Sequence, residues 1–156
     1  MSYKRSKYFL TPRNRKINYL LINKKSQITV VFFHGFMSDM IGKKPIAIEN
    51  FCKKQKLNFL KFEYSGHGKS SGKFTDGNIS KWTNDAKSLI RSKTKKSKNL
   101  IFVGSSMGSW IALNLFSYFK KKLKAFIGIA SAPEFLEELM WKKFNNKIKK
   151  IIMTKK

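Results

Sequence analysis

The sequence predicts one α/β domain whose mostly parallel sheet carries helices on both faces. Two observations lead to this prediction. Short apolar, β-branched runs alternate along the chain with longer segments of helical period, an order that produces βαβ units and parallel strand pairs. The 156 residues are also 42% apolar, which is enough to bury a core. Neither an internal repeat nor a linker divides the chain, so residues 1–156 are assigned to a single domain.

The elements of the first half are two early strands, a helix and a third strand. The strands are rich in β-branched and aromatic residues, and a polar turn at 23–26 separates the first two. A loop rich in glycine and serine follows at 65–77. The predicted strands are 17–22, 28–33 and 57–64, and the predicted helix is 46–55.

The second half continues the alternation. Residues 79–91 place their apolar side chains on one helical face, and 109–119 form a strongly apolar helix. The strand at 100–103 is apolar throughout, as expected of a strand covered on both faces, and a last strand is predicted at 125–130.

The tail, residues 134–156, has a different pattern. Apolar residues recur every four positions with lysines between them, which predicts a basic amphipathic helix. Such a helix can cover the edge of its own domain, lie on an anionic membrane surface or occupy a partner's groove.

The net charge of +26 comes from 34 basic and 8 acidic residues. Only four of the basic residues are arginines, although base and phosphate recognition relies on the arginine fork. Lysine is instead spread along the whole chain, which favours a compositional bias over a specific nucleic-acid site. Binding to a polyanion or a membrane surface stays open as an alternative.

Three features of the sequence bear on where in the cell the protein is located. No apolar run approaches the roughly 20 residues of a membrane span, and no secretory signal follows the N-terminus. A single cysteine, Cys52, excludes an internal disulfide and predicts a reducing, cytoplasmic location. We expect Cys52 to be a half-buried residue on a helix.

The chemistry concentrates in a G-x-S-x-G motif with Ser106 at its centre. The motif comes directly after an apolar strand and directly before an apolar helix. A serine at such a sharp turn projects its hydroxyl above the end of the strand, and Gly104 and Gly108 let the neighbouring chains pass closely. The first N–H of the helix, that of Met107, can then stabilise an oxyanion. An ordinary serine cap at a helix start is the alternative.

Two further segments fit the same arrangement. His34-Gly35-Phe36 follows the strand ending at Phe33, where an N–H could complete an oxyanion hole. The segment 63–70 follows the next strand and forms a glycine-rich loop. Such a loop can also cradle phosphate, but it has no Walker pattern and opens no helix.

Together the segments 33–40, 64–72 and 104–110 resemble the α/β-hydrolase superfamily, and within it the branch of the mitochondrial acyl-protein thioesterase, also described as an acyl-glucuronide esterase. The likeness extends over about residues 9–141, and it implies that a lid begins near Glu134. It implies that Ser106 is the nucleophile of an esterase or thioesterase, that the N–H groups of Phe36 and Met107 form the oxyanion hole, and that no metal or organic cofactor is needed. His34 would belong to the turn and not act as a base. Glu63 stands where the family usually has aspartate, which bears on anchoring the loop.

One departure from this family is larger. In the superfamily the acid and the histidine of the triad follow the serine along the chain, whereas both histidines here, His34 and His67, precede Ser106. The carboxylates after Ser106 are Glu134, Glu137 and Glu138. We therefore expect a C-terminally truncated hydrolase that lacks the last strands of the fold and has little or no activity alone. An exposed sheet edge would then favour self-association. A non-catalytic acyl-binding module is the alternative.

Overall fold

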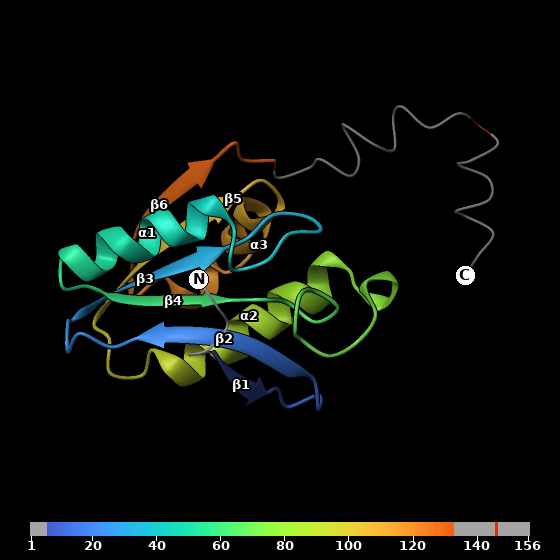
Figure 1. Cartoon of the computed structure of the whole chain (residues 1–156), viewed down its shortest axis with the longest axis horizontal. Helices are drawn as coiled ribbons and strands as arrows, with labels where there is room; N and C mark the ends of the chain where they lie inside the picture. The colour runs from blue at the N-terminus through green and yellow to red at the C-terminus, as the bar shows by residue number, and fades with distance from the viewer. Residues whose placement is uncertain (1–5, 133–145, 147–156) are drawn as a thin grey trace.

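Six strands form one mixed sheet in the order β1-β2-β4-β3-β5-β6 (Figure 1). The computed structural model describes residues 6–132 and residue 146, so the predicted tail helix lies, apart from that residue, outside the described residues. Strands β3 to β6 run parallel, whereas β1 pairs antiparallel with β2 and β2 antiparallel with β4. The predicted α/β class with a mostly parallel sheet is confirmed. The strands are β1 (Lys7–Leu10), β2 (Lys16–Ile22), β3 (Ile28–Phe33), β4 (Asn58–Phe62), β5 (Asn99–Ser105) and β6 (Leu123–Ile129).

Helices cover both faces of the sheet, as the sequence predicts. Helix α1 packs over a smaller core cluster on one face, and α2 and α3 pack over a larger cluster on the other (Figure 1). The longest described helix has 15 residues, and none of the helices at 6–132 is long and apolar enough to cross a membrane. The helices are α1 (Lys43–Lys54), the 3₁₀ turn η2 (Phe74–Asp76), α2 (Ile79–Lys93), α3 (Met107–Leu113) and α4 (Phe116–Phe119).

The single helix predicted over 109–119 is wrong. The structure has two short helices there, because the backbone tightens between them. The Leu115 N–H bonds to the Ala112 carbonyl three residues earlier, in place of the α-helical partner four residues earlier. This tightening lets both Leu115 and Phe119 turn into the core.

Strand β1 was not predicted, and it is one of the two edge strands of the described sheet. It has four residues, and two of its large side chains, Tyr8 and Leu10, are 47% and 60% exposed. A strand so short and so little buried has no periodic signal to detect. The polar turn at 23–26 connects β2 to β3 as predicted, but the two strands are not neighbours in the sheet, because β2 pairs with β4.

Cys52 lies on α1 and is fully buried between the helix and the sheet, with Val30 and Phe59 in the same cluster. The expectation of a half-buried residue is therefore wrong. Burial disfavours the thiolate and raises the pKa of Cys52 to about 11.

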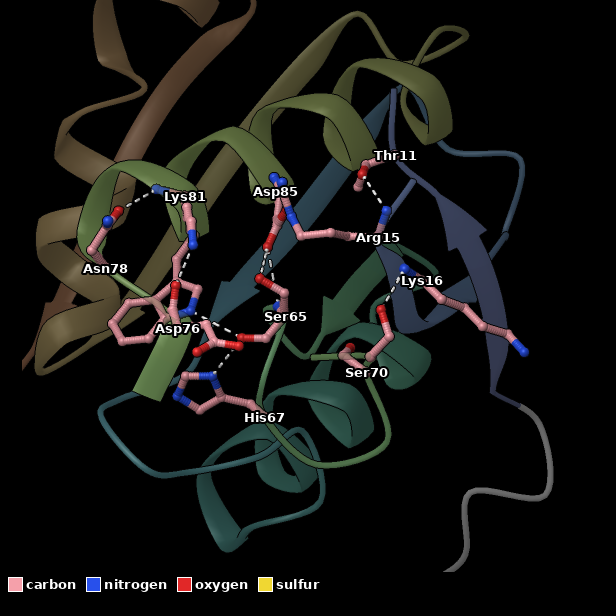
Figure 2. Close-up of polar contacts among 12 residues, drawn as sticks. Thr11, Arg15, Lys16, Ser65, His67, Ser70, Asp76, Asn78, Lys81 and Asp85 are labelled. Atoms are coloured by element: carbon pink, nitrogen blue, oxygen red, sulfur yellow. Dashed lines mark hydrogen bonds and ion pairs between the residues drawn. The ribbon is translucent and has the colours of Figure 1, made fainter. Parts of the chain in front are cut away.

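A buried carboxylate, Asp85 of α2, joins three separate segments at the carboxyl edge of the sheet. It forms an ion pair with Arg15, at 2.6 Å, in the turn between β1 and β2. It also accepts hydrogen bonds from the Ser65 hydroxyl at 2.6 Å and the Ser65 N–H at 3.1 Å, directly after β4 (Figure 2). Asp85 is completely buried, so these partners replace the water that the carboxylate loses.

A second buried carboxylate, Glu63, holds the glycine-rich loop. It accepts hydrogen bonds from the Asn18 amide at 2.8 Å and from the Lys69 N–H at 2.7 Å. Gly68 has a positive φ of 49°, and a Cβ there would collide with the Glu63 carboxylate. The loop therefore wraps closely around Glu63, in keeping with an anchoring role for this residue.

We predict that Asp85→Ala lowers the free energy of unfolding by about 3 kcal/mol, because it leaves Arg15 and the Ser65 N–H without their buried acceptor. Urea denaturation followed by tryptophan fluorescence measures the change. The matched control is Asp76→Ala, which removes an exposed carboxylate and should stay within about 0.5 kcal/mol of the unsubstituted chain. Equal losses in the two variants would contradict the anchoring role of Asp85.

Candidate active site

Ser106 stands alone between the end of β5 and the start of α3. Its backbone has φ 51° and ψ −122°, a conformation that residues with a Cβ adopt only where the surroundings hold them there. Its N–H donates to the Ile129 carbonyl of β6 at 3.0 Å, and its carbonyl accepts from the Ser109 N–H at 2.9 Å. The strand–turn–helix context that the motif requires is therefore present, with the turn strained at Ser106 itself.

The two glycines of the motif sit where no side chain fits. A Cβ at Gly104 would lie 2.5 Å from the Ser109 Cα in the first turn of α3. A Cβ at Gly108 would collide with the Phe33 carbonyl oxygen and lie 2.6 Å from that of His34. Glycine at these positions therefore lets α3 begin immediately beside the ends of β3 and β5.

The turn after β3 lies against Ser106. A Cβ built on Gly35 would be 3.4 Å from the Ser106 Cβ, so the turn at Gly35 lies beside the serine side chain. Phe36 follows directly and packs edge-on against Phe74, with ring centroids 5.1 Å apart. Met107 is buried at the first position of α3, where a helix offers its N–H no partner of its own. The two segments expected to supply oxyanion donors thus flank Ser106.

Neither histidine is hydrogen-bonded to Ser106. Nδ1 of His34 donates to the Gly35 carbonyl at 2.8 Å, and Nδ1 of His67 donates to the Ser65 carbonyl at 3.3 Å. Within the described part of the chain, Nε2 of each ring is buried without a hydrogen-bond partner. No described contact therefore gives Ser106 a general base.

Both histidines are nearly inaccessible to solvent: His34 is 1% exposed and His67 is 3% exposed. Burial lowers the pKa of His34 to about 3, against the opposing effect of its bond to Gly35. Burial also lowers the pKa of His67, although the Ser65 carbonyl and the charge of Glu63 act in the opposite direction. Both rings are consequently neutral at pH 7.

The structure places two charged residues near the carboxyl edge of the sheet that the sequence motifs do not indicate. Lys44, in the first turn of α1, donates from Nζ to the Ser105 hydroxyl at 3.2 Å. The ammonium group is thus hydrogen-bonded to the residue that precedes Ser106 in the chain. The other residue is Asp85, whose polar side chain on the buried face of a predicted helix was the only available signal.

We predict that the chain loses stability as the pH falls from 6.5 towards 5. The unfolded His34 takes up a proton below its ordinary pKa of 6.5, whereas the folded one resists protonation down to about pH 3. Unfolding is then favoured by about 1.4 kcal/mol per pH unit for this residue, or about 2 kcal/mol at pH 5 relative to pH 7, with His67 acting in the same direction. Urea unfolding at pH 5 and pH 7 measures the difference, and equal stability at both values would contradict it.

Several known proteins are similar to this chain in sequence. The family model described as "Serine aminopeptidase, S33" matches residues 24–155. The rat protein "Palmitoyl-protein thioesterase ABHD10, mitochondrial" (Rattus norvegicus) is 39% identical over 105 residues, which are 67% of this chain and 35% of the relative. The protein of the same name from Homo sapiens is 36% identical over 107 residues, 69% of this chain and 34% of the relative. The chain thus spans about a third of the length of these curated relatives.

Solved structures agree with the sequence comparison. A putative hydrolase from Agrobacterium vitis S4 superposes with a TM-score of 0.87 at 27% identity, over 96% of this chain and 61% of that one. The mouse "Alpha/beta hydrolase domain-containing protein 10" superposes with a TM-score of 0.83 at 29% identity, over 96% and 58% of the two chains. The family model, the relatives and the shared fold lead to one conclusion: the chain belongs to the α/β-hydrolase family that the S33 serine aminopeptidase model describes.

Proposed function

We propose that this chain carries the nucleophile and the oxyanion hole of a serine hydrolase that cleaves carboxylic ester or thioester bonds. The observation that supports this most is the strained backbone of Ser106 at the junction of β5 and α3. Strain at one residue persists only where the surrounding structure fixes it, and such residues cluster at functional sites. The position of Gly35 beside the Ser106 side chain adds a second segment with backbone donors near the serine.

The proposed reaction follows the usual acyl-transfer route. The Ser106 hydroxyl attacks the acyl carbon and gives its proton to a base, and the carbonyl oxygen becomes an oxyanion held by the N–H groups of Phe36 and Met107. The bond to the leaving oxygen or sulfur then breaks, and the leaving group takes up that proton. Water afterwards attacks the acyl-serine in the same manner, releases the carboxylic acid and restores the serine.

Within residues 6–132, no hydrogen bond that the structure describes joins Ser106 to a general base. Both histidines precede it, and each donates to a backbone carbonyl elsewhere. Removing members of a triad can lower turnover by about a millionfold, whereas an oxyanion hole with substrate binding retains roughly 10³–10⁴ over water. We therefore expect little turnover from these residues alone.

The substrate class rests on the relatives. The two curated relatives are named as palmitoyl-protein thioesterases, which makes a thioester the first substrate to test here. Their names also include the word mitochondrial, whereas the cytoplasmic location expected for this chain rests on its single cysteine and stays a prediction.

A non-catalytic acyl-binding module is the second candidate, favoured by the absence of a histidine contact to Ser106 among the described residues. Binding of a fluorescent fatty acyl analogue that is unchanged by Ser106→Ala, without covalent modification of the wild-type chain, would support this alternative.

We predict that a fluorophosphonate probe modifies Ser106 slowly but selectively, because a positioned hydroxyl beside oxyanion donors reacts with a phosphonyl group even without its base. Ser106→Ala should abolish the labelling, and peptide mass spectrometry identifies the modified residue. Ser117→Ala is the matched control, since it removes an exposed hydroxyl of α4 and should leave the labelling unchanged.

Hydrolysis of a short-chain activated ester and of an acyl thioester is measured in parallel. A folded wild-type chain whose Ser106 remains unlabelled, or a Ser106→Ala variant that is labelled as fast as the wild type, would contradict the assignment of the nucleophile.

A further inference from the structure

The peptide group between Gly35 and Phe36 is held in place by the ring of His34. Nδ1 of His34 lies 2.8 Å from the Gly35 carbonyl oxygen. A carbonyl oxygen can only accept a hydrogen bond, so Nδ1 must carry the proton of this contact. The buried ring is neutral, so its second nitrogen, Nε2, carries no proton and has a free lone pair.

The direction of the carbonyl fixes the direction of the neighbouring N–H. The described peptide bonds are all trans, and in a trans peptide the C=O and the N–H point in opposite directions. Because the Gly35 oxygen is drawn towards the imidazole, the N–H of Phe36 is directed away from it. Gly35 itself lies against the Ser106 side chain, so the peptide that His34 orients is the one beside the nucleophile.

The ring of His34 is in turn fixed by its neighbours. Its centroid lies 4.4 Å from that of Tyr64 and 5.0 Å from that of His67. The Tyr64 hydroxyl donates to the His34 carbonyl at 3.2 Å, which holds the backbone of the same residue. Side chain and main chain of His34 are thus both restrained.

His67 belongs to the same arrangement from the other side. It donates to the Ser65 carbonyl, as Figure 2 shows, and the Trp82 indole N–H donates to that oxygen at 3.0 Å. Its ring packs edge-on against Trp82 and Phe74, each with centroids about 5 Å apart. The glycine-rich loop therefore braces the imidazole that holds the turn after β3.

We propose that His34 is a positioning residue that sets the orientation of the Gly35–Phe36 peptide and thereby aims the Phe36 N–H at the acyl oxygen. The proposal rests on the function proposed above for Phe36 and adds to it the group that orients this donor. His34 uses only Nδ1 for this task, and His67 keeps the ring in place.

The first test needs no substitution. Long-range ¹H–¹⁵N spectra of histidine-labelled chain distinguish a protonated Nδ1 from a protonated Nε2, and we expect the Nδ1–H form for His34 at pH 7. An Nε2–H form, or a fast exchanging mixture, would overturn the proposal whatever the activity of the chain.

The second test compares two variants that differ in where they place a donor. The amide nitrogen of asparagine is as many bonds from Cβ as Nδ1 is, whereas that of glutamine matches Nε2. We expect His34→Asn to retain the backbone ¹H–¹⁵N signal of Phe36 and a Ser106 labelling rate within about threefold of wild type. His34→Gln should displace that signal and slow labelling by up to about a hundredfold, because it misdirects an oxyanion donor whose complete removal costs about 10²–10³ in turnover.

The outcomes separate the two proposals. If the wild-type Ser106 is labelled and both variants match it in labelling and in the Phe36 signal, His34 has no positioning role although the proposed function stands. If the wild type is not labelled, the function fails, and the Phe36 signal of the Asn and Gln variants still decides whether His34 orients the peptide. Equal displacement in both variants would also overturn the positioning role, since it would reflect only disturbed packing.

Discussion

The close approach of the first turn of α3 to the ends of β3 and β5 is the constraint on which the site depends. Gly108 leaves no room for a methyl group beside the Phe33 carbonyl, and Gly104 leaves none beside Ser109. With the helix so near the sheet, the chain must turn within one residue, and Ser106 takes the left-handed conformation that such a turn requires. Among the described residues, the position of the hydroxyl is therefore a result of backbone packing. Its N–H, bonded to Ile129, continues the pairing of β5 and β6 up to the turn.

Two buried carboxylates hold the loops around this turn in place. Asp85 ties the segment after β4 to α2 and to the β1–β2 turn, while Glu63 fills the centre of the glycine-rich loop. Each carboxylate accepts several hydrogen bonds, which compensates its loss of water. The loop that they hold carries His67, which connects their anchoring to the ring of His34 and the turn beside the nucleophile.

Much of this arrangement can be predicted from sequence wherever the signal is local. The apolar strand before Ser106 and the glycines around it define the turn, and alternating strands and helices define the class of fold. What escapes is determined by contacts between distant segments. Strand β1 exists through its pairing with β2, and the break between α3 and α4 accompanies the burial of Leu115 and Phe119. Likewise, the approach of Lys44 to Ser105 depends on how α1 crosses the sheet. The two residues are 61 positions apart, so no local sequence pattern predicts their contact.

The burial of Cys52 has a consequence for the covalent integrity of the chain. With a pKa of about 11, only about one thiol in ten thousand is ionised at pH 7, and the sulfur is shielded by the smaller core cluster. Disulfide exchange and alkylation both require the thiolate and access to it, so the folded molecule is inert to them. Unfolded molecules expose the same thiol and can cross-link through it. Covalent dimers of this protein would therefore record how many molecules had unfolded, independently of any association between native surfaces.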